Sequence, residues 1–347
     1  MHKISICIPT FNRCNLLANC LNSIILNTNY QKENIQVCVS DNCSTDNTDA
    51  VVRHAQKELD IVYSKNETNI GLARNFLKVV GMADGEYVWI IGDDDLLIPN
   101  ALEKLLPILY KNHIVDFFYI NSFNLTTEDI FNYPQPFHTK NLPSNMNKFS
   151  SYQCEMKIDF LDLIDPKISF DFLGGMFLSV FKREKWMDNI DALDSIAIND
   201  DKIFSHFDNT FPHVKIFAQA FCNSKAYFYS TPLSVSLSGA REWAPMYPFI
   251  RSVRLIEALD EYRRHGLPYW KFLIYKNFAL RNFIPDMLYM LVYKEESGYK
   301  YIQPLKLLSN IIYPEFYLSF FRFIFKFKNL KRLIDLVTSK DNKPPIK

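Results

Sequence analysis

The first 120 residues alternate between short apolar runs and longer amphipathic segments. The runs are rich in β-branched and aromatic residues, and they predict strands over 4–9, 35–40, 61–66, 87–92 and 115–120. The segments between them repeat apolar residues at helical spacing, and they predict helices over 14–27, 46–58, 71–83 and 99–112. This alternation indicates βαβ units, so we predict an α/β fold with a doubly wound, mainly parallel sheet.

The pattern changes in the second half of the chain. Residues 124–170 lose periodicity and are rich in Asn, Pro and Ser, which predicts an irregular insertion. Further strands are predicted over 174–182, 225–230 and 233–238, and the pattern is helical from Pro245 onward. We therefore expect one domain over 1–244, with halves 1–122 and 123–244, and a helical C-terminal extension over 245–347.

Each of the first four predicted strands is followed by polar residues. These clusters begin at Thr10, Asp41, Asn69 and Asp93. Neighbouring parallel strands end at one edge of a sheet, which is where open α/β sheets bind ligands. Turn chemistry alone explains Asn and Ser residues such as those at 42–44 equally well.

Asp93, Asp94 and Asp95 follow the apolar run 87–92 directly and require another explanation. Side chains alternate along a strand, so Asp93 and Asp95 converge while Asp94 points elsewhere. Converging carboxylates repel each other unless a hard cation such as Mg²⁺ or Mn²⁺ binds them, with phosphate oxygens completing its shell. The sequence therefore predicts a metal that holds a phosphate. It contains no Gly-Lys dipeptide and no G-x-G-x-x-G motif, which argues against P-loop, kinase and nicotinamide sites.

Four motifs together resemble glycosyltransferase family 2, whose members are inverting enzymes with the GT-A fold. In chain order they are ISICIPTFNR (4–13), VCVSDNCSTDNT (37–48), NIGLARN (69–75) and WIIGDDD (89–95). The resemblance covers residues 4 to about 110. It implies that the half over 1–122 binds a nucleotide sugar and that the half over 123–244 binds the acceptor.

The resemblance also implies roles for individual residues. The loop that would wrap the nucleotide consists of Pro9, Thr10, Phe11, Asn12 and Arg13. Asp41 is expected to contact the base, while Asn69, Arg74 and Asn75 support the diphosphate. Asp93 or Asp94 would lie near the ribose, and the expected metal ligands are Asp95 and Asp93. Gly92 stands where the family often has a further acid.

The catalytic base is expected at a helix start in the second half, where the family often has a Glu-Asp pair. No such pair follows the strand predicted over 174–182; residues 198–221 instead offer Asp200, Asp201, His206, Asp208 and His213. We select Asp208 and His213, at the edge of the next predicted helix, with Asp201 as a third candidate. Asp208 is equally well explained as a helix N-cap, and His213 as a core histidine or a metal ligand. Arg241 is expected to bind the diphosphate from a flexible loop.

Charge and cysteine content add two expectations. Residues 245–347 hold 18 Lys and Arg against 9 Asp and Glu, whereas residues 1–244 hold 21 against 29. The seven cysteines are odd in number and include no C-x-x-C pair, which fits a reduced cytosol. We find no signal peptide and no apolar stretch of 18 residues. The protein is therefore expected in the cytoplasm or on the cytoplasmic face of the inner membrane.

A helix predicted over 316–334 allows two interpretations. Its polar residues Ser319, Arg322, Lys326 and Asn329 fall within an arc of about 80°, with Phe and Leu over most of the rest. A mostly buried helix that closes the domain is the first interpretation. An interfacial helix whose basic residues Lys328, Lys331 and Arg332 reach anionic headgroups is the second.

The predicted activity is metal-dependent, inverting transfer of a sugar from a nucleotide-diphosphate sugar, with Mn²⁺ or Mg²⁺ as cofactor. The acceptor would be a hydroxyl of a glycan or lipid-linked oligosaccharide in bacterial surface polysaccharide synthesis (O-antigen, capsule or lipooligosaccharide). We expect no nucleic-acid partner. One alternative is a sugar nucleotidyltransferase, although PTFNRCN (9–15) lacks the usual Gly-rich basic signature. The other is a non-catalytic nucleotide-sugar-binding protein.

Overall fold

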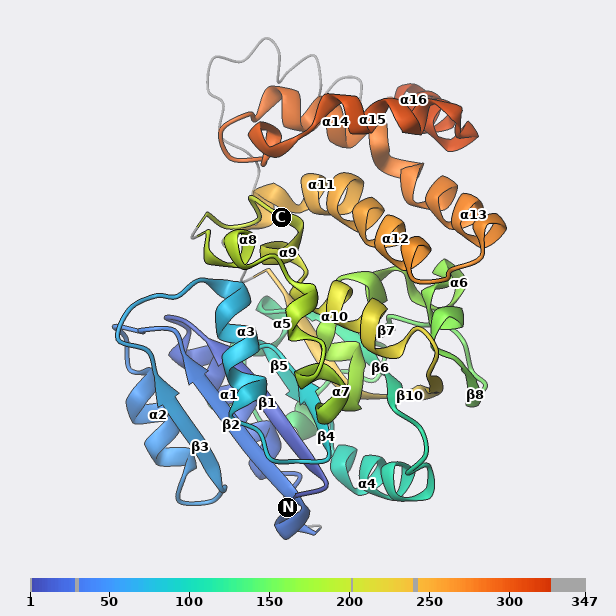
Figure 1. Ribbon diagram of the computed structural model, residues 1–347. Coiled ribbons are helices and arrows are strands. Elements are labelled where there is room, and N and C mark those ends of the chain that lie inside the picture. The colour runs from blue at the N-terminus through green and yellow to red at the C-terminus, as the bar shows by residue number, and fades with distance from the viewer. Residues whose placement is uncertain (1, 29–30, 201, 240–242, 326–347) are drawn as a thin grey trace.

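A ten-stranded mixed sheet runs through the molecule (Figure 1). The structure is a computed structural model and describes residues 2–28, 31–200, 202–239 and 243–325. The strand order is β3-β2-β1-β4-β9-β6-β10-β5, with β7 paired to β6 and β8 paired to β10. The strands are β1 (Ile4–Thr10), β2 (Ile35–Asp41), β3 (Ile61–Lys65), β4 (Tyr87–Ile90), β5 (Asp95–Leu97), β6 (Phe117–Thr126), β7 (Asn147–Lys148), β8 (Met156–Asp159), β9 (Ser179–Lys182) and β10 (Lys225–Ser238).

The longer strands all run in one direction. β1 pairs in parallel with β2 and β4, β2 with β3, and β6 with β10. Strand β9 is antiparallel to both β4 and β6, so the two parallel groups on either side of it point the same way. The remaining antiparallel strands, β5, β7 and β8, are short. The predicted doubly wound, mainly parallel α/β fold is confirmed.

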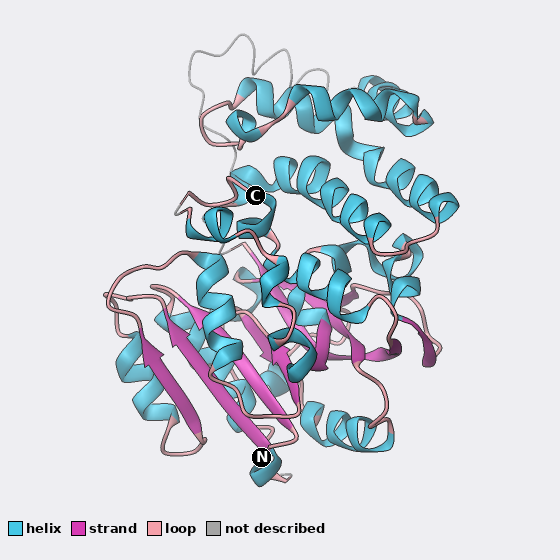
Figure 2. Cartoon of the chain, viewed as in Figure 1, coloured by secondary structure: helices cyan, strands magenta, loops and turns pink. Residues whose placement is uncertain are grey.

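Helices cover both faces of the sheet (Figure 2). Ile4, Ile6 and Ile8 of β1 share one core with α1, α2 and α4, whereas Cys7 shares the opposite core with α3. Burial on both faces explains why the strands are continuous apolar runs. The α-helices of this part are α1 (Cys14–Ile25), α2 (Thr48–Ala55), α3 (Leu72–Gly81), α4 (Ala101–Lys111), α5 (Glu128–Phe131), α6 (Pro166–Ser169), α7 (Arg183–Met187), α8 (Ser195–Asn199), α9 (Phe207–Thr210) and α10 (Pro212–Phe221).

Two details of the second half differ from the predicted strands. Within 174–182, strand β9 begins at Ser179, because Met176–Leu178 forms a 3-10 turn. The runs over 225–230 and 233–238 form one strand, β10, with a register shift between Tyr229 and Ser234. Pro232 lies within this shift; because it has no N–H to donate, pairing is interrupted there while the chain stays extended.

The C-terminal extension is helical, as predicted, and lies beyond α8 and α9 at the top of Figure 1. It joins the larger body through α12, whose apolar residues share a core with α10. None of the described helices is long and apolar enough to cross a membrane. The elements are α11 (Tyr247–Phe249), the π-helix η8 (Ile250–Arg254), α12 (Leu255–Arg264), α13 (Tyr269–Ala279), α14 (Phe283–Val292), α15 (Pro304–Leu307), η11 (Leu308–Ile312) and α16 (Pro314–Phe325).

Helix α16 is not the buried helix that the first interpretation expected. Among its 12 residues, all of them described, Ser319 alone is buried. The Ser319 hydroxyl donates to the carbonyl of Phe316 and accepts from the backbone N–H of Ile284, which holds this polar residue inward. The apolar residues Leu318, Phe321 and Phe325 are exposed instead. Residues 326–334 of the predicted helix, including the basic residues expected at headgroups, lie outside the described residues.

Candidate active site

The polar residues that follow the parallel strands meet at one edge of the sheet. Thr10 at the end of β1 is in register with Asp41 at the end of β2, and Asp41 is in register with Lys65 of β3. The backbone N–H of Asn42 donates to the carbonyl of Thr10, which ties the loops after β1 and β2 together. The edge predicted from the strand pattern therefore exists.

Asp93 lies at the centre of this edge. One of its carboxylate oxygens accepts from the Thr10 hydroxyl at 2.8 Å, and the other accepts from Nη1 of Arg13 at 2.7 Å. The same Nη1 lies 3.3 Å from Oδ2 of Asp94. Burial raises the pKa of Asp93 to about 6, while the Arg13 guanidinium opposes that rise. Arg13 thus holds adjacent carboxylates that would otherwise repel each other.

Asp95 is placed by a tight turn from Gly92. The N–H of Asp95 donates to the Gly92 carbonyl at 3.1 Å, and the N–H of Gly92 donates to Oδ2 of Asp95 at 2.6 Å. A Cβ atom on Gly92 would lie 2.4 Å from Oδ1 of Asp94, so a larger residue here would displace that carboxylate. Asp93, Asp94 and Asp95 are at most 5% exposed.

The chemistry of this carboxylate set fits Mg²⁺ or Mn²⁺. The described residues contain no cluster of three or more His, Cys, Asp or Glu that would hold a metal alone. Mg²⁺ commonly binds one or two protein carboxylates and takes its other ligands from substrate phosphates and water. Asp94 and Asp95 supply suitable oxygens. Asp93 stays a predicted ligand as well, and its two oxygens accept hydrogen bonds from Thr10 and Arg13.

Asp41 forms the second polar centre of the edge. It is fully buried; its Oδ1 accepts from the backbone N–H of Ser44 at 2.7 Å, and its Oδ2 accepts from the Tyr63 hydroxyl at 2.9 Å. Burial and the Asp41 carboxylate raise the pKa of Tyr63. Asp41 therefore orders the loop after β2, which lies against Asn12.

Asp208 lies in the first turn of α9. Its Oδ2 accepts from the backbone N–H of Asp194 at 2.7 Å and from Nζ of Lys215 at 2.8 Å. No hydrogen bond among the described residues engages its Oδ1. The N-cap of α9 is His206, so the cap interpretation of Asp208 is wrong. A carboxylate paired with a lysine through one oxygen, with the other oxygen not bonded, is suited to accept a proton.

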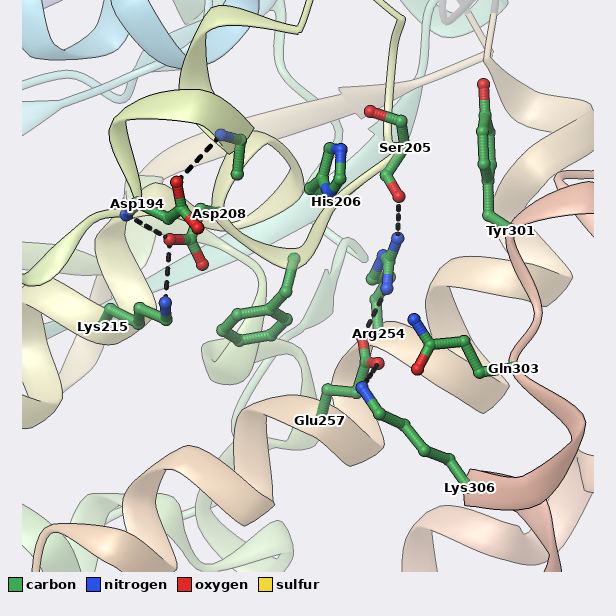
Figure 3. A pocket seen from close by; sticks show the side chains of 12 residues that line it. Asp194, Ser205, His206, Asp208, Lys215, Arg254, Glu257, Tyr301, Gln303 and Lys306 are labelled. Atoms are coloured by element: carbon green, nitrogen blue, oxygen red, sulfur yellow. Dashed lines mark hydrogen bonds and ion pairs between the residues drawn. The ribbon is translucent and has the colours of Figure 1, made fainter.

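Asp208 lines a cavity of about 200 Å³ between the loop after α8 and the C-terminal extension. Figure 3 shows Asp208 and Lys215 on one side, and Arg254, Glu257 and Gln303 on the other. The cavity thus combines residues from both parts of the chain.

Comparison with known proteins identifies the N-terminal part. Residues 5–160, a little under half of the chain, match the glycosyl transferase family 2 model. This region is a glycosyl transferase family 2 domain. Its polar sheet edge is the part that carries the four sequence motifs, so the resemblance seen in the sequence is confirmed.

Curated relatives match the family 2 domain over short stretches. The abequosyltransferase RfbV of Salmonella typhimurium is 43% identical over 106 residues, which cover 29% of this chain and 31% of that protein. A GalNAc(5)-diNAcBac-PP-undecaprenol beta-1,3-glucosyltransferase of Campylobacter jejuni is 38% identical over 109 residues, 30% of this chain and 34% of that protein. The match therefore spans about a third of the length of these relatives.

A solved structure resembles a larger part of the chain. The crystal structure of residues 1–349 of TarS from Staphylococcus aureus covers 97% of this chain and 81% of that chain, with a TM-score of 0.53 and 17% identity. At this identity the likeness concerns the fold, and it agrees with the GT-A architecture predicted from the sequence.

Several residues expected to bind the nucleotide sugar form hydrogen bonds with other protein groups. Asn75 donates to the Ser40 carbonyl and accepts from the Ser40 hydroxyl, so its amide is committed to β2. Asn69 accepts from the side chain of Asn42 at 2.7 Å. Arg74 donates to Asn199 at 3.0 Å and ties α3 to α8. These contacts hold the three side chains in place, and their support of the diphosphate stays a prediction.

The loop after β1 remains suited to the nucleotide. Phe11 is 41% exposed beside Asn12, whose side chain accepts from the N–H of Thr45. An exposed ring at this edge can stack on a base. Pro9 is the buried residue that leads from β1 into this loop.

Three of the candidates in the second half are either buried away from the site or outside the described residues. His213 is 1% exposed and lies between the rings of Phe211 and Phe217, at centroid distances of 5.7 and 5.6 Å. Burial lowers its pKa to about 3. The core interpretation of His213 holds, and the base and metal-ligand roles do not, because solvent and substrate cannot reach the ring. Asp201 and Arg241 lie outside the described residues.

Sequence reasoning missed the partners of the candidate base. Lys215 follows Asp208 by seven residues, and a cation this close in the sequence could have been recognised as its ion-pair partner. Nε2 of His206 lies 3.3 Å from Oδ2 of Asp200, on the loop that leads to α9. Arg254 is 46 residues beyond Asp208, and no local pattern relates the two.

We expect Asp41→Ala to raise the KM for the sugar donor by roughly tenfold while kcat changes less. The family resemblance implies that Asp41 contacts the base; such a contact is made in both ground and transition states, so its loss affects binding more than chemistry. Steady-state kinetics with varied donor checks this. Tyr63→Phe, which removes one hydrogen bond from Asp41 but keeps its charge, is the control; an unchanged donor KM in Asp41→Ala would remove Asp41 from the nucleotide site.

Proposed function

We propose that this protein is an inverting glycosyltransferase that uses a nucleotide-diphosphate sugar. The observation that carries this proposal is the buried aspartate turn, with Asp93 and Asp94 held by Arg13 at the carboxyl edge of a family 2 domain. The named relatives, both sugar transferases, support the same activity.

In this proposal the donor diphosphate lies against the aspartate turn and the loop Pro9–Arg13. Asp94 and Asp95 would hold Mg²⁺ or Mn²⁺, and the cation would neutralise the negative charge of the leaving diphosphate. Asp208 accepts the proton of the acceptor hydroxyl as the oxygen attacks the anomeric carbon. The new carbon–oxygen bond forms on the face opposite the breaking bond, and the nucleoside diphosphate leaves with the electron pair. One displacement of this kind inverts the configuration.

For the acceptor we propose a glycan or lipid-linked oligosaccharide of a bacterial cell surface. The Campylobacter relative is named for an undecaprenol-linked acceptor, and TarS for poly(ribitol-phosphate), which supports this class. We place the reaction at the cytoplasmic face of the inner membrane, where a nucleotide sugar and a lipid-linked acceptor meet.

The test is a panel of nucleotide sugars with and without Mn²⁺ or Mg²⁺. Metal-dependent thermal stabilisation by one donor, followed by release of its nucleoside diphosphate, is the expected result. Release of inorganic pyrophosphate from a nucleoside triphosphate and a sugar phosphate would instead identify a nucleotidyltransferase. Tight donor binding with no turnover, not even hydrolysis, would identify a non-catalytic binding protein.

The exposed apolar surface of residues 304–325 supports membrane association. Leu305 and Phe325 are 82% and 83% exposed, and Leu308, Ile312 and Phe321 are exposed between them. The sequence that follows, 326–347, holds seven Lys and Arg against two Asp and Glu. Apolar side chains beside basic residues are the pattern of segments that bind anionic lipid surfaces.

Replacing Phe321 and Phe325 together by serine should weaken binding to vesicles that contain phosphatidylglycerol at least about tenfold. Burial of each phenylalanine contributes roughly 1.5–3 kcal/mol, so the pair accounts for more than that factor. Vesicle sedimentation measures the change. Ile114→Ser, which removes a 69% exposed apolar residue beyond α4, is the matched control. Equal binding by the double variant and the control would contradict membrane association through this surface.

A further inference from the structure

The cavity beside Asp208 is built from two distant parts of the chain. One wall comes from residues 194–215, and the other from Arg254, Glu257, Tyr301, Gln303 and Lys306 of the C-terminal extension. Figure 3 shows these side chains around one space, with Tyr301 and Gln303 opposite Asp208. The cavity therefore depends on the extension as much as on the candidate base.

The cavity lining carries as many basic as acidic side chains. Lys215, Arg254 and Lys306 face Asp194, Asp208 and Glu257. Each cation has an acidic partner: Lys215 pairs with Asp208 at 2.8 Å, Arg254 with Glu257 at 2.5 Å, and Lys306 with Glu257 at 3.6 Å. A phosphate group would need unpaired cations, so the lining favours a ligand without net charge.

The cavity wall is held rigidly. The Nη2 atom of Arg254 donates to the carbonyls of Phe204 and Ser205, both at 2.9 Å. The same guanidinium lies 4.7 Å from the ring centroid of Phe249. Arg254 ends the π-helix η8, and such wide turns occur frequently at functional sites. These contacts fix the wall in place before any ligand binds.

The volume of the cavity and the remaining groups of its lining restrict the class of ligand further. A volume of about 200 Å³ is more than ten times the roughly 15 Å³ that one water needs, yet it is below the roughly 300 Å³ of sites for drug-sized ligands. Sugar hydroxyls both donate and accept, which matches a lining of alternating ammonium, carboxylate and amide groups. The rings of Phe207 and Tyr301 provide apolar surface for the C–H face of a sugar.

We propose that this cavity binds one neutral sugar unit of the acceptor and presents its hydroxyl to Asp208. The assignment rests on the glycosyltransferase function proposed above. It adds that the acceptor end is an uncharged sugar ring, and that Tyr301 and Gln303 of the C-terminal extension select it. The hydroxyl proton passes to Oδ1 of Asp208 as the sugar oxygen bonds to the donor's anomeric carbon and the nucleoside diphosphate departs.

The test uses the full chain and a panel of methyl glycosides of common neutral hexoses, observed by saturation-transfer NMR. At least one glycoside should bind, and Gln303→Leu and Tyr301→Ala should each weaken its binding at least about fivefold. Gln153→Leu, which changes another exposed glutamine outside the cavity, should not alter it. Inorganic phosphate should not displace the glycoside.

Three outcomes would overturn the proposal: no glycoside binding at about 100 mM, binding that both cavity variants retain in full, or displacement by phosphate. Donor binding, measured in parallel by thermal shift with nucleotide sugars, separates this proposal from the general one. Failure of every donor to bind refutes the glycosyltransferase function, whereas donor binding without a glycoside effect refutes the sugar subsite alone.

Discussion

Asp95→Asn is expected to lower kcat for sugar transfer at least about a hundredfold while the protein keeps its fold. The amide oxygen can still accept from the Gly92 N–H, so the turn that places residues 93–95 survives. The negative charge that would hold the cation against the leaving diphosphate is lost, and electrostatic stabilisation of this kind is worth roughly that factor or more. Kinetics at several Mn²⁺ concentrations, with a thermal melt beside them, measures both effects.

The Mn²⁺ dependence is the decisive readout in this experiment. If Asp95 is a metal ligand, the variant needs more Mn²⁺ for half-maximal activity. If Asp95 only shapes the turn, the substitution changes the melting temperature and leaves the Mn²⁺ dependence as it is. Wild-type-like turnover after chelation of all divalent cations would remove the metal from the mechanism.

Asp208→Asn should lower kcat by roughly a hundredfold or more and leave donor affinity unchanged, because loss of a general base typically costs about that factor. The amide oxygen can still accept from the Asp194 N–H, so a structural contact is preserved. The KM for the donor should stay constant, since Asp208 lines the cavity proposed for the acceptor.

Two further variants separate catalysis from structure in this region. Lys215→Met leaves the carboxylate but removes the cation paired with it, so kcat should change while the KM for the donor stays constant. Asp200→Asn tests the competing pair of His206 and Asp200. Near-normal kcat in Asp208→Asn with a large loss in Asp200→Asn would transfer the base role to that pair.

The donor side of the site was predictable because its information is local. An apolar run of five or six residues that ends in Asp41 or Asp93 signals a buried strand followed by a polar group. Parallel strands must end at the same edge, so the strand pattern alone predicted that these groups meet. The ends of the elements were less predictable: β9 is shorter than its apolar run, because the 3-10 turn Met176–Leu178 is as apolar as the strand that follows it.

The acceptor side depends on contacts between residues far apart in the chain. His213 and Asp208 were equal candidates by position. In the structure, His213 of α10 packs in an aromatic core, whereas Asp208 of α9 lines a cavity. Burial, which the local pattern does not encode, decides between them, because desolvation keeps the His213 ring neutral.

The sequence by itself determined the α/β class, the family and the carboxylates at the sheet edge, because periodicity and motif spacing act within a few residues. The tertiary structure decided which partner each of those groups has. It paired Arg13 with Asp93 and bonded Asn75 to Ser40. It also buried Ser319 while Phe325 is exposed. It also closed a cavity around Asp208 with residues almost a hundred positions away. Hydrogen bonds and burial depend on packing between distant segments, and that is the physical reason for the division.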